Sequence, residues 1–195
     1  MRKVIVMMQV SVDGFIEGPD HDLSWHRVDE VLHSHFNEEL RKMGMFLDGR
    51  VTYELMADYW PTADQDPSST PPEAEFAAIW RDMPKIVYSS TLQAAGWNTE
   101  VVRDVVAEDI ALLKAQSGGD LAVGGANLSA SFRRLGLIDE YWIYVHPVLV
   151  GRGTPLFAEA DASTPLRLLE TRAFGNGVAL LRYGVEPDTE HAKDR

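Results

Sequence analysis

The sequence predicts an α/β protein whose largely parallel sheet is finished by antiparallel strands at one edge. Two observations predict this fold class. Through residue 135, short apolar runs typical of strands alternate with stretches whose apolar residues recur at helical spacing, as in a sheet with helical crossovers. From residue 139 onward, strand-like runs follow one another at 139–150, 166–171 and 178–186 with no helix between them, which is typical of antiparallel strands.

The first half of the chain begins with a predicted strand at 3–10, KVIVMMQV, followed by a loop rich in Asp, Gly and Pro that runs through Trp25. The next apolar residues lie three or four positions apart and predict a helix over 28–43. After it we expect a strand at 45–49, a helix at 50–60, a proline-rich surface loop at 61–75, a helix at 73–82 and a strand at 85–90.

The second half continues this alternation until it reaches two adjacent glycines, Gly124 and Gly125. A helix over 127–135 is predicted directly after them from its amphipathic spacing, with Asn127 as its N-cap and Gly136 as its stop. Before the glycines we expect a strand at 99–103, a helix at 106–116 and a strand at 121–123.

The composition is typical of one soluble globular domain. The chain has 195 residues, of which 45% are hydrophobic and 25% charged, enough to form one substantial core. We assign residues 1–185 to this domain and expect the charged end, 186–195, to be disordered. Because no apolar run approaches the roughly 20 residues of a membrane span and no signal-peptide pattern is visible, we expect a cytoplasmic location without membrane partners.

Charge and cysteine content exclude several kinds of site. With no cysteine, the chain cannot form disulfides, thiolate nucleophiles or cysteine-ligated metal centres. Its net charge of -12 disfavours nonspecific binding to nucleic acid. His33 and His35 are two residues apart and would point to different sides of a helix, so no metal site is expected. An anionic ligand would have to be held by local donors and a few arginines.

Three predicted strand ends carry polar turns that contain glycine or serine, at 48–54, 89–91 and 124–129. Ligands of open α/β sheets bind outside the carboxyl ends of strands. The glycine pair permits the close approach of a ligand to the main chain, but such a pair also serves as a plain tight connection from strand to helix. Both interpretations stay open at this point.

A dinucleotide would use all three turns. Gly49 and the helix after it, together with Arg50 and Thr52, offer donors to a phosphate group. Ser89 and Ser90 offer hydroxyl groups to an adenosine 2′-phosphate, while residues 124–128 form a helix start suited to a pyrophosphate. A Rossmann fingerprint is excluded because GGANLSA lacks the G-x-G-x-x-G spacing.

The segments VSVDGFIEG, DGRVTYE, KIVYSS and VGGANLSASFRRLGLIDEYWIYVHPVLVGRGTPLF follow one another in this order. Their order and spacing resemble the dihydrofolate reductase superfamily over residues 3–185, and the last segment is especially similar to the reductase domain of bacterial riboflavin biosynthesis deaminase-reductases. The resemblance implies a three-layer sandwich around a mostly parallel sheet of about eight strands. It also implies NADPH as cofactor, a homodimer and a cis bond between Gly124 and Gly125.

The resemblance assigns roles to particular residues. Gln9 would flank the nicotinamide with its main chain and Ile16 with its side chain, and the loop from Asp13 to Trp25 would close over that ring. The implied cofactor-binding residues are Gln9, Ile16, Gly49, Arg50, Thr52, Tyr53, Ser89, Ser90, Gly124, Gly125, Ala126, Asn127 and Leu128.

Departures from the family bear on the substrate. His33 stands where dihydrofolate reductases place a carboxylate on the first helix, and Asp29 is the nearest carboxylate, so both are candidate catalytic residues. The arginine that binds the folate tail aligns near Met83, which makes folate doubtful. The deaminase domain of the riboflavin enzymes has no counterpart here, and no clear cationic cluster suits a phosphoribosyl group.

The leading hypothesis is an NADPH-dependent reductase that transfers hydride to a small, pteridine- or pyrimidine-like heterocycle, similar to 5-amino-6-(5-phosphoribosylamino)uracil reductase or dihydrofolate reductase. The alternative is a non-catalytic nucleotide-binding or ligand-sensing protein that retains the fold. A protein that sequesters small molecules without a nucleotide ranks third. Consumption of NADPH would distinguish the first hypothesis from the second.

Overall fold

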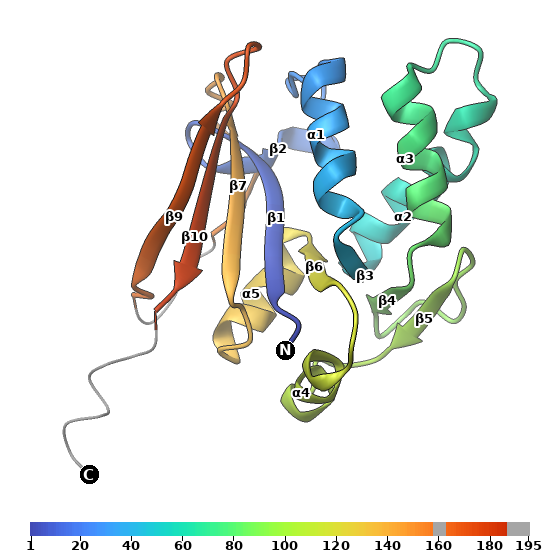
Figure 1. The fold of residues 1–195 in the computed structure, drawn as a ribbon, viewed down its shortest axis with the longest axis vertical. Helices are drawn as coiled ribbons and strands as arrows, with labels where there is room; N and C mark the ends of the chain where they lie inside the picture. The colour runs from blue at the N-terminus through green and yellow to red at the C-terminus, as the bar shows by residue number, and fades with distance from the viewer. Residues whose placement is uncertain (158–162, 187–195) are drawn as a thin grey trace.

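The computed structural model describes residues 1–157 and 163–186, in which an eight-stranded sheet lies between two layers of helices (Figure 1). Across the sheet the strand order is β5-β4-β3-β6-β1-β7-β10-β9. The strands are β1 (Val4–Ser11), β3 (Met43–Gly49), β4 (Lys85–Tyr88), β5 (Thr99–Val102), β6 (Asp120–Gly124), β7 (Glu140–His146), β9 (Leu166–Ala173) and β10 (Ala179–Val185). The helices are α1 (Glu30–Leu40), α2 (Arg50–Tyr59), α3 (Pro71–Asp82), α4 (Ala107–Ala115) and α5 (Ala126–Arg134).

The pairing of the strands confirms the predicted fold class. Strand β1 pairs in parallel with both β6 and β7, and the series continues in parallel from β6 through β3 and β4 to β5. Strand β10 pairs antiparallel with β7 on one side and with β9 on the other. The sheet is therefore mostly parallel and ends in an antiparallel edge.

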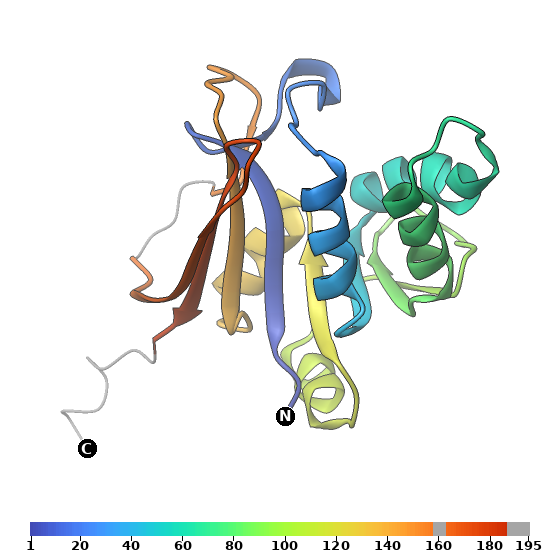
Figure 2. The same cartoon turned by 45° about the horizontal axis from the view of Figure 1, so that its top comes forward.

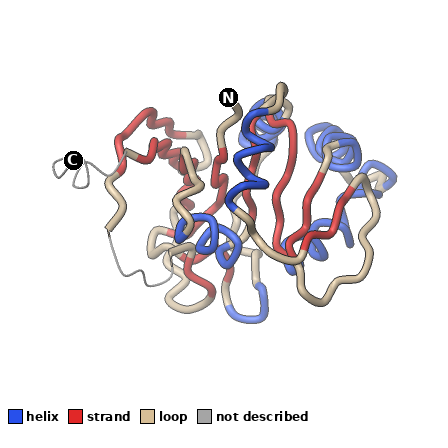
Figure 3. The backbone as a smooth tube through the Cα atoms, turned by 90° about the horizontal axis from the view of Figure 1, so that it is seen from below, coloured by secondary structure: helices blue, strands red, loops and turns tan. Residues whose placement is uncertain are grey.

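Two hydrophobic clusters cover the two faces of the sheet, and alternate residues of β1 enter one or the other. Ile5 lies in the first cluster with Leu32 of α1 and Trp80 of α3. Val4 lies in the second cluster with Phe132 of α5. Helices α1 and α5 consequently pack on opposite faces, as Figures 2 and 3 show from two directions.

Several predicted boundaries are wrong for identifiable reasons. Helix α1 covers Glu30–Leu40 and not 28–43, because Met43 already belongs to the strand that follows. The expected loop at 61–75 contains a 3-10 helix, η2 (Trp60–Gln65). Helix α3 starts early within it, since Thr70 and Glu73 form a capping box.

The helix after the glycine pair also begins differently from the prediction. Helix α5 starts at Ala126, so its N-cap is Gly125 and not Asn127, which lies inside the first turn. The described residues contain no cis peptide bond, so the cis bond expected between Gly124 and Gly125 is wrong for this structure.

The loop after β1 is joined to a distant segment by a second, two-stranded sheet. Strand β2 (Phe15–Glu17) pairs antiparallel with β8 (Thr154–Pro155). At the start of the loop, the Asp13 carboxylate accepts hydrogen bonds from the main-chain N–H groups of Val150 and Gly151, at 3.1 and 2.7 Å. The loop expected to close over a ligand is therefore tied to residues 150–155.

The remaining expectations on organisation concern the end of the chain and the membrane. Of the segment 186–195 that we expected to be disordered, all but Glu186 lies outside the described residues. Over residues 1–157 and 163–186, no helix is both long and apolar enough to cross a bilayer.

Candidate functional site

The carboxyl ends of β1 and β6 lie next to each other in the middle of the sheet. These two strands are neighbours, but the chain leaves β1 toward α1 on one face and leaves β6 toward α5 on the other. This arrangement is a topological switch point, the place where open α/β sheets bind ligands. We therefore take the carboxyl ends of β1, β6 and their neighbours as the candidate site.

The structure brings the three predicted turns together beside this switch point. Strand register places Asp48 of β3 opposite Gly124 of β6. On the other side of β3, Gly49 lies opposite Tyr88, the residue before Ser89. Three segments that are more than 30 residues apart in the sequence thus end side by side at one edge of the sheet.

Two helices begin next to each other at this edge. The N-cap residues are Gly49 for α2 and Gly125 for α5, and neither helix start has a side-chain cap or an acidic residue in its first turn. A Cβ atom built on Gly49 would lie 3.9 Å from the Cβ of Leu128 in α5. The free N–H groups and the positive ends of both helix dipoles therefore face the same region, which suits an anion.

Close packing explains why both residues of the pair are glycine. A Cβ on Gly124 would lie 2.5 Å from Oδ1 of Asp48, and a Cβ on Gly125 would lie 2.6 Å from Oγ1 of Thr52. Gly125 also has a φ of 87°, a conformation that other residues rarely adopt. The glycine pair therefore does form a tight connection from strand to helix, and Thr52 of α2 packs against it. Its role in binding a ligand stays a prediction.

Asp48 is an unusual carboxylate because it lies at the base of the turn and is only 6% exposed. Burial raises the pKa of Asp48 to about 7, and the charge of Lys85 partly opposes this rise. No hydrogen bond to its carboxylate is formed by the residues that the structure describes. The burial of this carboxylate was not predicted, since an acidic residue before a glycine turn is usually solvated.

The residues after β4 form the side of the site expected to hold a 2′-phosphate. Ser90 is exposed, whereas Ser89 is buried and its Oγ accepts hydrogen bonds from the main-chain N–H groups of Thr91 and Leu92. Arg50 is exposed next to them and pairs with Glu54 at 2.6 Å.

Arg103 is a residue that sequence reasoning missed. Its Nη1 donates to the carbonyl oxygens of Ser89 and Leu92, both at 2.8 Å, which places a second guanidinium beside the serines. Its position at the end of a predicted strand, at 99–103, was a usable signal, because a basic residue at a fourth strand end extends the same pattern.

Tyr53 serves the scaffold of the site. Its ring is buried and stacks near Trp80, with ring centroids 6.1 Å apart. Its hydroxyl accepts from the N–H of Gly96 and donates to the carbonyl oxygen of the same residue, at 3.0 and 3.1 Å. These contacts hold the loop after β4 against α2, and they leave the cofactor role of Tyr53 as a prediction only.

Both candidate catalytic residues have structural partners. Asp29 is the N-cap of α1, and its Oδ1 accepts from the N–H of Leu32 at 2.9 Å. His33 packs against the rings of Trp60 and Phe76, with centroids 5.7 and 5.9 Å away. Burial lowers the pKa of His33, against an opposing effect of Glu73. Their roles as proton donors stay predictions.

Gln9 and Ile16, which we expect to flank a nicotinamide, lie in β1 and in the loop that follows it. Gln9 is half-buried near the end of β1, and its Oε1 lies 2.9 Å from Nε2 of His146. Ile16 belongs to β2, in the tied loop, and packs against the second hydrophobic cluster.

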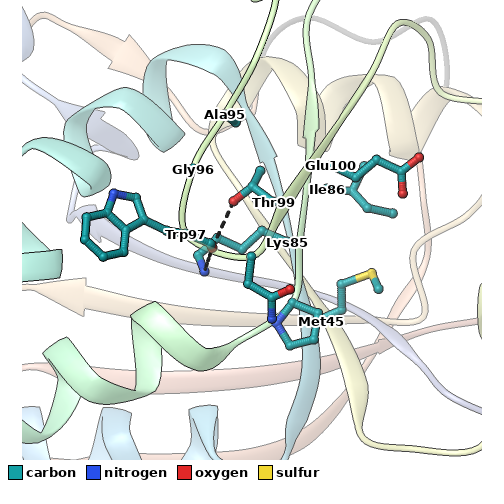
Figure 4. Close-up of a pocket in the computed structure, with 10 residues that line it drawn as sticks. Met45, Lys85, Ile86, Ala95, Gly96, Trp97, Thr99 and Glu100 are labelled. Atoms are coloured by element: carbon teal, nitrogen blue, oxygen red, sulfur yellow. Dashed lines mark hydrogen bonds between the residues drawn. The ribbon is translucent and has the colours of Figure 1, made fainter.

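A separate pocket of about 520 Å³ opens far from this edge (Figure 4). It is lined by residues at the starts of three strands, among them Met45, Lys85 and Thr99, together with Trp97. Because it lies at the amino ends of the strands, it is not part of the switch-point site. In the described ranges, no three His, Asp or Glu side chains lie close enough to hold a metal ion.

Comparisons with known proteins bear on the family and the fold of the chain. The model of the RibD C-terminal domain family matches residues 2–180. The chain is 32% identical to the uncharacterized protein YyaP of Bacillus subtilis strain 168 over 183 residues, which cover 93% of this chain and 94% of YyaP.

Solved structures show the same fold at lower sequence identity. A protein from Shewanella sp. PV-4 assigned to riboflavin biosynthesis matches with a TM-score of 0.74 at 21% identity, over 95% of this chain and 99% of that one. RibD of Acinetobacter baumannii matches with a TM-score of 0.68 at 15% identity, and the match covers 95% of this chain but 58% of RibD.

Proposed function

The chain belongs to the RibD C-terminal domain family, and we propose from this premise that it is an NADPH-dependent reductase of a small, pteridine- or pyrimidine-like heterocycle. The observation that carries the proposal is the pair of adjacent helix starts, after Gly49 and Gly125, at a topological switch point. Such a pair provides converging N–H donors for the phosphates of a dinucleotide, despite the net charge of -12.

The residues of the site divide the work of binding. The N–H groups of Ala126, Asn127 and Leu128 at the start of α5 receive the pyrophosphate. Arg50, Arg103 and Ser90 provide the donors for a 2′-phosphate, because a guanidinium binds phosphate through paired hydrogen bonds. This 2′-phosphate site is the basis for preferring NADPH over NADH.

The other half of the site orients the reacting groups and excludes water. When bound, the reduced nicotinamide supplies the hydride. Gln9 and Ile16 would hold its ring, and the loop held by β2 and β8 would exclude bulk water from it. Asp29 and His33 are our candidates for the donor of the accompanying proton.

Calorimetric titration with NADPH, and separately with NADH, tests the proposal. We expect micromolar binding of NADPH and binding of NADH that is at least tenfold weaker. Reducible pterins and pyrimidines are then screened by the loss of NADPH absorbance. Absence of heat with either nucleotide, at two temperatures and at concentrations far above micromolar, would rule out a nucleotide-dependent reductase.

A second candidate function is a nucleotide-binding sensor without turnover. It is favoured by one observation: both candidate proton donors are engaged in structural contacts. Asp29 caps α1, and His33 packs against two aromatic rings. The sensor binds NADPH as tightly as the reductase does. It is distinguished by a constant NADPH absorbance in the presence of every substrate screened.

We also propose that two copies of the chain associate through β9. All eight residues of this edge strand are exposed, including Leu166 and Leu168, and an exposed apolar edge readily accepts another strand. Light scattering after size-exclusion chromatography is expected to give twice the chain mass of 21.8 kDa. A monomeric mass at micromolar concentration would contradict this assembly.

A further inference from the structure

A chain of hydrogen bonds ends at the side chain of Gln9, near the carboxyl end of β1. The main-chain N–H of Arg27 donates to Nδ1 of His146 at 3.0 Å. Nε2 of the same ring lies 2.9 Å from Oε1 of Gln9. Gln9 and His146 are 137 positions apart in the sequence, and the fold brings them to the carboxyl ends of the neighbouring strands β1 and β7.

The protonation of His146 follows from these contacts. Since Nδ1 accepts a hydrogen bond, the single proton of the neutral ring is on Nε2, which donates to Gln9. His146 is 0% exposed, and burial lowers its pKa to about 4, with smaller effects of His26 and Arg27 in the same direction. The ring is therefore neutral near pH 7, in one tautomer.

A fixed tautomer fixes the amide of Gln9. The group facing His146 must be the acceptor, Oε1, so the Nε2 amine group of Gln9 points elsewhere. This amine donates no hydrogen bond to any residue that the structure describes.

The backbone places Gln9 at a stretch of β1 that is unpaired on the β6 side. The pairing of β1 with β6 ends at Val6 and Val123, so Gln9 lies beyond the last paired residues and has no strand neighbour on that side. Along β1, Gln9 follows the alternation of Ile5 and Met7, which pack in the first cluster, and thus faces the α1 side.

Two aromatic rings pack against His146 and hold it in place. His26 stacks on His146 with centroids 5.1 Å apart, and Trp25 meets His146 edge-on at 5.7 Å. Both rings belong to the end of the loop that covers the site. An ordered covering loop and an oriented amide therefore depend on the same contacts.

We propose that the Nε2 amine of Gln9 recognises a carbonyl oxygen of the ligand bound at the carboxyl ends of β1 and β6, and that His146 is the positioning residue that orients it. The inference rests on the proposed reductase function. The carbonyl belongs either to the nicotinamide carboxamide or to a ring carbonyl of the heterocyclic substrate, since both present the same acceptor to the same donor.

The test compares Gln9→Met, which keeps the length of the side chain without its donor, with Gln9→Glu, which keeps the acceptor for His146. Dissociation constants are measured for NADPH and, on the protein loaded with NADP⁺, for pterin. We expect both variants to weaken one of the two ligands about tenfold, as for the loss of one hydrogen bond. Weaker binding of NADPH would identify the nicotinamide carboxamide as the partner of the amine. Weaker binding of pterin would identify the ring carbonyl of the substrate.

A double-mutant cycle tests the positioning role of His146. His146→Phe alone is expected to weaken the same ligand severalfold, but to cause no further loss in the Gln9→Met background. A purely structural histidine would instead lower affinity equally in both backgrounds. Gln116→Met is the matched control, because Gln116 is exposed and lies outside the candidate site. Thermal unfolding checks that each variant folds.

Two results would overturn the inference. Unchanged affinity of both Gln9 variants for NADPH and for pterin removes the role of the amine, even if His146→Phe does not fold. If the wild-type protein binds neither NADPH nor NADH, the proposed function fails as well. Failure of the wild-type protein and failure confined to the variants are thereby distinguished.

Discussion

Two buried charged residues, Asp48 and Lys85, lie at opposite ends of neighbouring strands, and they differ in their hydrogen bonds. Lys85 begins β4 and is 2% exposed; its Nζ donates to the carbonyl oxygens of Met83 and Trp97, at 2.7 and 2.9 Å, and lies 4.3 Å from the ring centroid of Trp80. Asp48 ends β3, is 6% exposed and has no hydrogen-bond partner among residues 1–157 and 163–186.

The difference separates a structural charge from one left available for function. Burial lowers the pKa of Lys85 to about 8 and raises that of Asp48 to about 7, and each charge acts against the shift of the other. The lysine compensates for burial through its hydrogen bonds, whereas the carboxylate does not. Strongly shifted pKa values concentrate at functional sites, and Asp48, whose pKa burial raises, lies beside the turn proposed to bind phosphate.

The largest effect on stability is expected for Lys85→Met. The change leaves the carbonyl oxygen of Met83 without this donor and loosens Trp97, which holds a positive φ of 58°. We expect a loss of about 2 to 3 kcal/mol in the free energy of unfolding, measured by urea denaturation. NADPH affinity should stay within twofold, and a large loss of affinity would show that the two ends of the sheet are not independent.

Asp48→Asn should have the opposite sign and depend on pH. The folded pKa near 7 lies above the unfolded value of 3.8, so the folded state binds the extra proton between these values and wild-type stability falls as pH rises through this window. We expect the variant to be more stable than wild type by about 2 kcal/mol at pH 8, and by much less at pH 5. If the difference in unfolding free energy between variant and wild type were the same at both pH values, the raised pKa of Asp48 would be contradicted.

Asp48→Asn also sharpens the comparison through binding. Because an ionised Asp48 opposes an anion at Gly124, the variant should bind NADPH severalfold more tightly than wild type at pH 8 and equally at pH 5.5. Calorimetry at the two pH values measures this difference, and Asp109→Asn, at an exposed carboxylate in α4, provides the control.

Gly124→Ala is expected to cost about 1 to 2 kcal/mol, because the new Cβ would lie 2.5 Å from Oδ1 of Asp48. If that contact is the cause, the loss should be largely relieved in the Asp48→Ala background. Thermal unfolding of the two single variants and the double variant completes this cycle. Additive losses would place the strain elsewhere in the turn.

The smallest effect on stability is expected for Arg50→Ala. The guanidinium is exposed, and within the described part of the chain it pairs only with Glu54 of the same helix, a contact worth less than about 0.5 kcal/mol. NADPH binding should nevertheless weaken about tenfold while NADH binding barely changes. Glu54→Gln is the matched control, since it removes the ion pair and keeps the arginine.

The sequence allowed the sheet and the position of its main turns to be predicted, because alternating apolar periods report burial directly. Boundaries were harder: Met43 fits the helical spacing of 28–43 but belongs to a strand, and an apolar residue alone does not distinguish the two. The burial of Asp48 and the contact between Gln9 and His146 could not be predicted, since both depend on segments distant in sequence.

The central position of β1 has a consequence for how the chain is made. Its two partners, β6 and β7, are Asp120–Gly124 and Glu140–His146, so on the ribosome the run KVIVMMQV emerges long before either can pair with it. The apolar strand stays unpaired while more than 100 further residues are synthesised, and during this time it can associate with non-native segments. Nascent-chain folding should therefore complete late and in one step, and a permuted gene that brings β1 next to β7 should fold sooner.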